Sequence, residues 1–88
     1  MGQLVKVFKA LSNNVRLEIL SLLAERPLCV NALVNWLNVS QPAVSQHLRV
    51  LENAGLVKGN KMGYWVHYSL VPESFAECLS FLKELQGR

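Results

Sequence analysis

Apolar residues recur at helical spacing along most of the chain, and the pattern changes period near residue 56. It predicts helices over residues 4–11, 14–25, 30–37 and 40–54, with a cap and turn at 12–14. Residues 56–58 and 64–68 are rich in β-branched and aromatic side chains, which is typical of strands, and 59–63 form the expected hairpin tip. A last helix is expected from Pro72 to about Gln86. The pattern predicts a mainly α fold of about five helices and a two-stranded β-hairpin.

The helix that begins at Ser40 has clear ends and two chemically different faces. Ser40 is a good N-cap, and Pro42 lies in the first turn, where its missing N–H costs nothing. Gly55 suits the left-handed conformation just past the helix end. One face is apolar and carries Val44 and Leu48. The opposite face holds mostly uncharged hydrogen-bonding side chains and one arginine, namely Gln41, Ser45, Gln46, Arg49, Glu52 and Asn53.

The third and fourth predicted helices are joined by the short turn at Asn38-Val39, which makes a helix-turn-helix, and the hairpin behind them is a wing. Amides and an arginine near a helix N-terminus are suited to the base edges of a DNA major groove, whereas an ordinary solvated face carries more Lys and Glu. The predicted DNA-binding residues are Ser40, Gln41, Ala43, Ser45, Gln46 and Arg49 on the helix, and Lys58, Lys61 and Tyr64 on the wing. The alternative for the three wing residues is that they only keep an exposed hairpin soluble and do not contact DNA.

The last predicted helix carries an apolar stripe that is too wide for a terminal helix lying on one small domain. We therefore expect it to form a dimer interface together with the first helix. The residues predicted for that interface are Leu4, Phe8, Phe75, Leu79, Leu82 and Leu85.

Composition narrows the picture without changing it. The 88 residues make one domain, 1–88, and 51% of them are hydrophobic, so apolar surface remains for a partner. The net charge of +3 modestly favours a polyanion such as DNA. No segment approaches a membrane span, and the start is neither a signal peptide nor a myristoylation signal, which predicts a cytoplasmic protein. No catalytic residues are expected, because no nucleophile–base–acid set, Gly-rich phosphate loop or HExxH-type motif is present.

The chain resembles the ArsR-type winged-helix repressors, the arsenical- and metal-responsive family. The resemblance is carried, in the family's order and spacing, by FKALSN at 8–13, RLEIL at 16–20, LCV at 28–30, SQPAVSQHL at 40–48, LENAGLV at 51–57 and WVHYSL at 65–70. It implies a homodimer that binds a palindromic operator in double-stranded DNA and leaves it when a ligand or chemical signal arrives.

The chain departs from the family's patterns at the sensing residues. Where family members of the arsenic type carry Cys-Val-Cys at the start of the third helix, this chain reads Cys29-Val30-Asn31. The last helix contains no His, so the family's zinc-type site is not expected. Cys29 and Cys78 are candidate thiol sensors, and each has packing as its alternative. No cofactor is established by the residues, and a thiophilic metal or metalloid at Cys29 is the one candidate, although such sites use two or three thiolates.

The two histidines lack metal-ligand spacing with each other. His47 lies within the apolar arc of its helix and is expected to be a structural, hydrogen-bonded residue. His67 shares a strand face with Trp65 and Ser69, where it either contacts the operator backbone or packs.

The sequence thus predicts a homodimeric, sequence-specific DNA-binding repressor. The competing interpretation is a winged-helix protein-interaction module that binds no DNA, for which acidic or apolar residues on the fourth helix would be typical.

Overall fold

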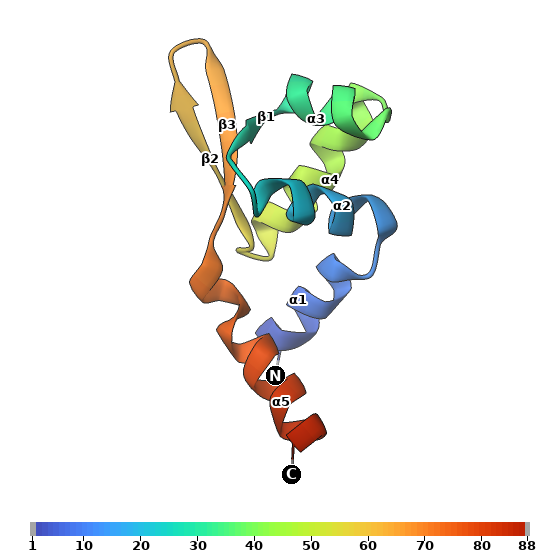
Figure 1. The fold of residues 1–88 in the computed structure, drawn as a ribbon, viewed down its shortest axis with the longest axis vertical. Helices are drawn as coiled ribbons and strands as arrows, with labels where there is room; N and C mark the ends of the chain where they lie inside the picture. Colours follow the sequence, from blue (N-terminus) through green and yellow to red (C-terminus); the bar gives the residue numbers. More distant parts are fainter. Residues whose placement is uncertain (1, 88) are drawn as a thin grey trace.

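The computed structural model describes residues 2–87 and has the predicted mainly α architecture (Figure 1). Its helices are α1 (Gly2–Leu11), α2 (Asn14–Leu23), α3 (Val30–Leu37), α4 (Gln41–Asn53) and α5 (Ala76–Gly87), with a 3-10 turn η1 (Pro72–Phe75) before α5. The strands are β1 (Leu28–Cys29), β2 (Val57–Met62) and β3 (Trp65–Leu70).

Several signals read at the helix ends mark real boundaries. However, α1 begins at Gly2 rather than at residue 4, and the helix predicted from Pro72 starts as the 3-10 turn η1, with α5 beginning at Ala76. Asn13 caps α2 by accepting a hydrogen bond from the Arg16 N–H at 3.1 Å. The α2 helix ends at Leu23 rather than Glu25, because the Glu25 N–H bonds to Leu22 O in a tightened final turn. Asn38 takes the left-handed conformation, with φ 54°, in the turn between α3 and α4.

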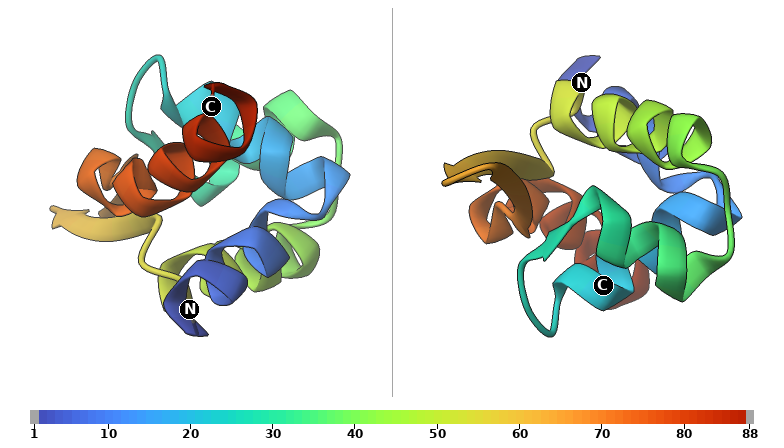
Figure 2. Two further views of the ribbon diagram at one scale, coloured as in Figure 1. Left: turned by 90° about the horizontal axis from the view of Figure 1, so that it is seen from below. Right: turned by 90° about the horizontal axis from the view of Figure 1, so that it is seen from above.

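The core lies where α2, α3 and α4 meet the base of the sheet. Its largest fully buried side chains are Ile19, Leu33, Val44, Leu48, Leu51 and Leu56. Both views in Figure 2 show α1 alongside α4, where Gln3 Nε2 donates to Ala54 O at 3.2 Å. The apolar face predicted for α4 is therefore the face that fixes it to the rest of the domain.

The sheet has three antiparallel strands in the order β1-β3-β2. The predicted two-stranded hairpin is confirmed as β2 and β3, and β1 adds a third strand that was not predicted. Leu28 pairs with Tyr68 and Cys29 with His67. A strand of two residues has no alternation from which it can be recognised, which is why the sequence pattern did not indicate β1.

The predicted hairpin tip at 59–63 was wrong, because Gly59 to Met62 belong to β2 and the turn is only Gly63 and Tyr64. Gly59 was interpreted as a turn residue. Its place in the strand has a packing reason, since a Cβ at that position would lie 3.0 Å from Val66 and 3.2 Å from Tyr68. Gly63 supplies the positive φ, 66°, that the short turn needs.

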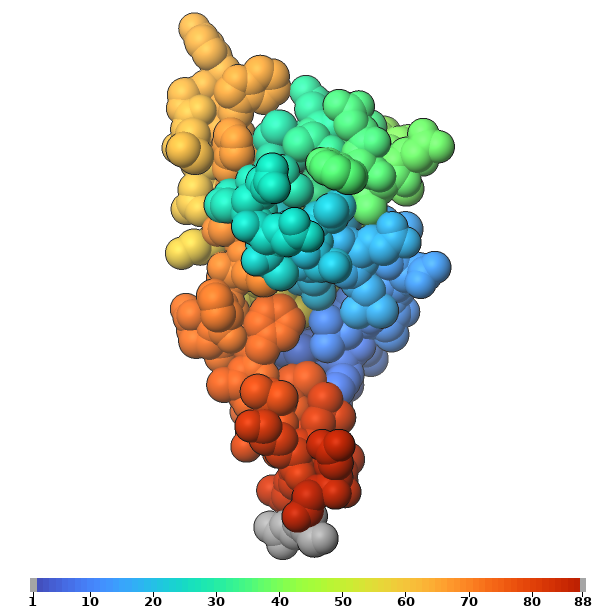
Figure 3. Space-filling model, viewed as in Figure 1, coloured from blue at the N-terminus to red at the C-terminus, as the bar shows by residue number. Residues whose placement is uncertain are grey.

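The molecule is elongated, with extents of 47 × 23 × 23 Å. Figure 3 shows the wing projecting at one end and the body tapering into α5 at the other. The wing and the exposed part of α5 are therefore well separated.

Candidate nucleic-acid interface

The polar face of α4 is accessible to a partner. Gln41, Gln46 and Arg49 are exposed, Ala43 and Ser45 are half-buried, and the Arg49 guanidinium donates to Gln46 Oε1 at 3.2 Å. The structure therefore brings the residues predicted on this helix together on one surface. Apart from Arg49 and Glu52, this surface is uncharged and rich in donors and acceptors.

The N-terminus of α4 is exposed and capped. Ser40 Oγ accepts from the Ala43 N–H at 3.3 Å, and Pro42 occupies the first turn. Free N–H groups and the helix dipole at such an end favour an anionic group. The local geometry can therefore hold a phosphate beside the polar face.

Arg16 holds α4 in place, a role that the sequence pattern did not indicate. Its guanidinium donates to two carbonyls at the end of α1, from Nε to Ala10 O at 2.6 Å and from Nη2 to Lys9 O at 3.2 Å. A third nitrogen, Nη1, lies 3.3 Å from His47 Nδ1 on α4. The feature of the sequence that could have indicated these contacts is an arginine three residues after the Asn13 cap, in a largely apolar helix.

His47 is half-buried and hydrogen-bonded, as predicted for a structural histidine. Burial lowers the pKa of His47 below its usual value of 6.5, and the positive charge of Arg16 lowers it further. Neutral His47 accepts the Arg16 N–H. Arg16, on α2, therefore connects α1 through Lys9 O and Ala10 O with α4 through His47, and we call this set of contacts the polar bracket.

The wing residues do not share one face. Lys58 pairs with Ser69 and Lys61 with Val66, and because side chains alternate along a strand the two lysines point to opposite sides of the sheet. Tyr64 is fully exposed at the hairpin turn. The three predicted wing contacts are therefore available to solvent but are not presented as one patch.

The residues predicted for the dimer interface divide into two groups. Leu79, Leu82 and Leu85 on α5 are 53%, 47% and 68% exposed. Leu4 is only 5% exposed and belongs to the core, while Phe8 and Phe75 are half-buried. Phe8 packs edge-on against Phe81 with ring centroids 6.1 Å apart, which joins α1 to α5.

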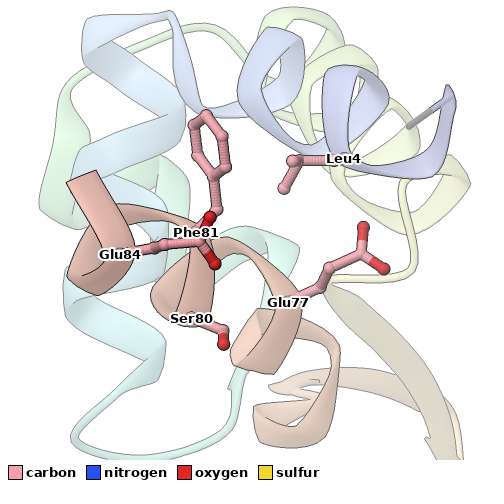
Figure 4. Close-up of a pocket in the computed structure, with 5 residues that line it drawn as sticks. All are labelled: Leu4, Glu77, Ser80, Phe81 and Glu84. Carbon is pink, nitrogen blue, oxygen red and sulfur yellow. The ribbon is translucent and has the colours of Figure 1, made fainter. Parts of the chain in front are cut away.

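A shallow hollow of about 390 Å³ lies beside this junction and is lined by Leu4, Phe81 and two glutamates of α5, Glu77 and Glu84. Figure 4 shows Leu4 reaching in from α1 opposite the Phe81 ring, with Glu77, Ser80 and Glu84 on α5. The hollow at the α1–α5 junction therefore combines apolar side chains with two carboxylates.

The two cysteines have different surroundings. Cys78 is 6% exposed and packs in the core, whereas Cys29 is half-buried and is the residue that precedes α3. Residues 2–87 contain no group of three or more His, Cys, Asp or Glu side chains placed to hold a metal ion. Nor does any helix in that range have the length and apolar character needed to cross a bilayer.

Comparisons with known proteins agree with this arrangement. The family model described as "Bacterial regulatory protein, arsR family" matches residues 13–58, more than half of the chain. An uncharacterized HTH-type transcriptional regulator of Methanocaldococcus jannaschii is 40% identical over 81 residues, which cover 91% of each chain. The arsenical resistance operon repressor of Escherichia coli is 45% identical over 69 residues, which cover 77% of this chain and 59% of that repressor.

Solved structures give the same result. An ArsR-like transcriptional regulator from Rhodococcus matches with a TM-score of 0.90 at 30% identity, covering 97% of this chain and 78% of that one. A homodimeric winged helix-turn-helix DNA-binding domain from Mycobacterium bovis, a possible ArsR-family regulator, matches with a TM-score of 0.81 at 29% identity, covering 97% and 79%. The protein therefore belongs to the ArsR family of bacterial transcriptional regulators and has its winged helix-turn-helix fold.

Proposed function

We propose that this chain is a homodimeric repressor that acts in the cytoplasm by binding a palindromic operator through α4. One observation carries the proposal, which is the exposed amide, hydroxyl and arginine surface on a helix whose opposite face is locked into the core. A surface of this kind supplies the donors and acceptors that base edges require, on a support rigid enough to keep them in register.

Each residue has a role in this proposal. Arg49 pairs with guanine and Gln41 or Gln46 with adenine, as their side-chain geometry favours. Ser45 and Ala43 contact the groove wall, and the capped end at Ser40 holds a phosphate. Lys58, Lys61 and Tyr64 contact the backbone or minor groove from the wing.

The dimer follows from the exposed leucines of α5. Three large apolar side chains in a row are costly to leave in water, and a second copy of the same helix covers them. The Mycobacterium bovis neighbour is described as homodimeric, which supports this assembly. A twofold dimer would place its two α4 helices in successive major grooves, about 34 Å apart.

The inducing signal in this proposal is thiol-directed. Relatives are named for arsenical and cadmium resistance, which supports a thiophilic metal or metalloid as the signal. Cys29 is the candidate sensor because it is the accessible thiol, and Cys78 is packed within the core. Binding at Cys29 would favour a dimer geometry in which the two α4 helices no longer match the operator spacing.

A salt titration tests the proposal against a protein-interaction module. The purified protein is titrated with its own upstream DNA and with random duplex between about 50 and 200 mM salt, where a DNA reader making several phosphate contacts loses affinity by orders of magnitude. We expect steep salt dependence on both duplexes and tighter binding to the upstream DNA. Absence of binding to either duplex at low salt would favour the protein-interaction module.

A further inference from the structure

Cys29 and His67 are directly opposite each other in the β1–β3 pair. Opposed residues in an antiparallel pair lie on the same face of the sheet, with Cβ atoms about 4.5–5.5 Å apart. The neighbouring pair, Leu28 and Tyr68, packs against the core, so Cys29 and His67 lie on the other face. The short strand β1 thus places a thiol beside an imidazole that is 38 positions away in sequence, as the pairing Cys29↔His67 defines.

His67 Nδ1 is buried and has no hydrogen-bond partner within the part of the chain that the structure describes. The polar neighbour on the next strand, Asn60, donates from Nδ2 to Ser69 Oγ at 3.3 Å and not to His67. A buried nitrogen without a partner is unfavourable, and nearly all such atoms in folded proteins bond to protein, water or a bound ion. This unpartnered nitrogen and the thiol of Cys29 therefore belong to directly opposed residues on one face of the sheet.

We propose that Cys29 Sγ and His67 Nδ1 form a two-ligand site for a soft d10 cation that accepts linear coordination, Cu(I) in the first instance. The thiol releases its proton to solvent as the metal–sulfur bond forms, and His67 binds the ion through Nδ1. Sulfur and imidazole are the donors that soft ions prefer. Zinc is not suited to the site, because structural zinc takes four ligands and residues 2–87 offer no third His, Cys, Asp or Glu there.

The position of the site connects the two parts of the proposed DNA-binding surface. Cys29 precedes α3 without making a side-chain capping bond, and His67 belongs to the strand that continues into the wing. A hollow of about 220 Å³, lined by Cys29, Asn31 and Trp65 among others, gives solvent access beside the thiol. A bound ion would tie α3 to the wing, and its regulatory meaning rests on the proposed operator binding.

The test uses Ag(I) as an air-stable probe on the whole protein, free of DNA. Native mass spectrometry should find one Ag(I) per chain, and 15N NMR should show a large shift of His67 Nδ1 upon binding. Removal of a ligand's supporting partner already costs about 10–100-fold in metal affinity, so Cys29→Ser and His67→Gln should each weaken binding by at least about 100-fold. Cys78→Ser is the matched control, because it removes the other thiol, and it should bind like the wild type.

Binding by His67→Gln at wild-type affinity would overturn the two-ligand site, as would an unshifted His67 Nδ1 in the silver-loaded wild type. The NMR arm needs no substitution, so it decides the question even if a variant fails to fold. A gel shift with operator DNA in the absence of metal runs separately. If the protein binds Ag(I) but does not shift operator DNA, only the proposed function is refuted. If it shifts operator DNA but does not bind Ag(I), only the metal site is refuted.

Discussion

At the scale of single residues, the least expected feature is the polar bracket around Arg16. One guanidinium contacts the last carbonyls of α1 and the imidazole of His47 on α4. Hydrogen bonds from a charged donor contribute more than neutral ones, on the order of 1.5–3 kcal/mol each. The sequence pattern placed His47 correctly but did not reveal its partner, because a contact between residues 31 positions apart leaves no local signal.

His47 makes the stability of the fold sensitive to acid. Its pKa is lower in the folded chain than the ordinary 6.5, through burial and Arg16, so the unfolded chain binds a proton first as pH falls. Stability is therefore complete above about pH 6.5 and declines as pH falls below it. Thermal unfolding followed from pH 8 to pH 5 should show a smaller decline for His47→Gln than for the wild type. Parallel profiles for the two proteins would contradict this assignment.

Arg49 is expected to contribute directly to operator affinity. Arg49→Ala should weaken operator binding by roughly 1–3 kcal/mol and leave the dimer intact, because its side chain is exposed and hydrogen-bonds to Gln46 on the same helix. Fluorescence anisotropy with a labelled operator measures the change. Arg26→Ala removes the same charge from the loop after α2 and should change affinity much less. Equal affinities for Arg49→Ala and the wild type would remove Arg49 from the site.

At the scale of elements, the sequence pattern predicted best where one element carries its own signals. The helix α4 has its cap, its first-turn proline and its Gly55 stop within a single segment, and each is where it was expected. The wing was predicted less well, because the pattern predicted Gly59 in a turn. It lies within β2, where the lack of a side chain leaves room for Tyr68. The strand β1 and the Cys29–His67 pair depend on tertiary pairing alone, which local periodicity does not contain.

The link between α1 and α4 should be measurable as stability. Arg16→Met keeps much of the aliphatic stem but removes the bonds to Lys9 O, Ala10 O and His47, and should lower the free energy of unfolding by about 1–3 kcal/mol. Urea unfolding measures the loss. Arg16→Lys keeps the charge without the planar fork and should recover only part of it. A fully stable Arg16→Met protein would show that the bracket contributes nothing.

At the scale of the whole molecule, the surface is divided between two ends. The wing projects at one end, and the exposed leucines of α5 lie at the other (Figure 3). Tight operator binding in the proposed mechanism requires both, since each copy supplies one α4 and the α5 contact sets the distance between the two copies. The amphipathic pattern predicted the apolar stripe but not that Leu4 would be used within the core.

Disrupting the α5 row should therefore abolish tight operator binding without touching α4. Leu82→Glu places a charge among exposed leucines and should yield a monomer by analytical ultracentrifugation, with a large loss of operator affinity. Ser80→Glu introduces the same side chain at an exposed position on the opposite side of α5 from Leu82 and should remain dimeric. A dimeric Leu82→Glu protein would place the interface elsewhere.

The opposed lysines of the wing have a consequence for how a ribbon can meet the duplex. A ribbon laid flat brings one lysine to the DNA and leaves the other in solvent, whereas a ribbon entering edge-on between the two sugar-phosphate strands brings Lys58 to one strand and Lys61 to the other. Each neutralised phosphate contributes about 0.9 to the slope of log affinity against log salt. Loss of both lysines should reduce that slope by nearly twice this amount if the wing enters edge-on, and by one such step if it lies flat.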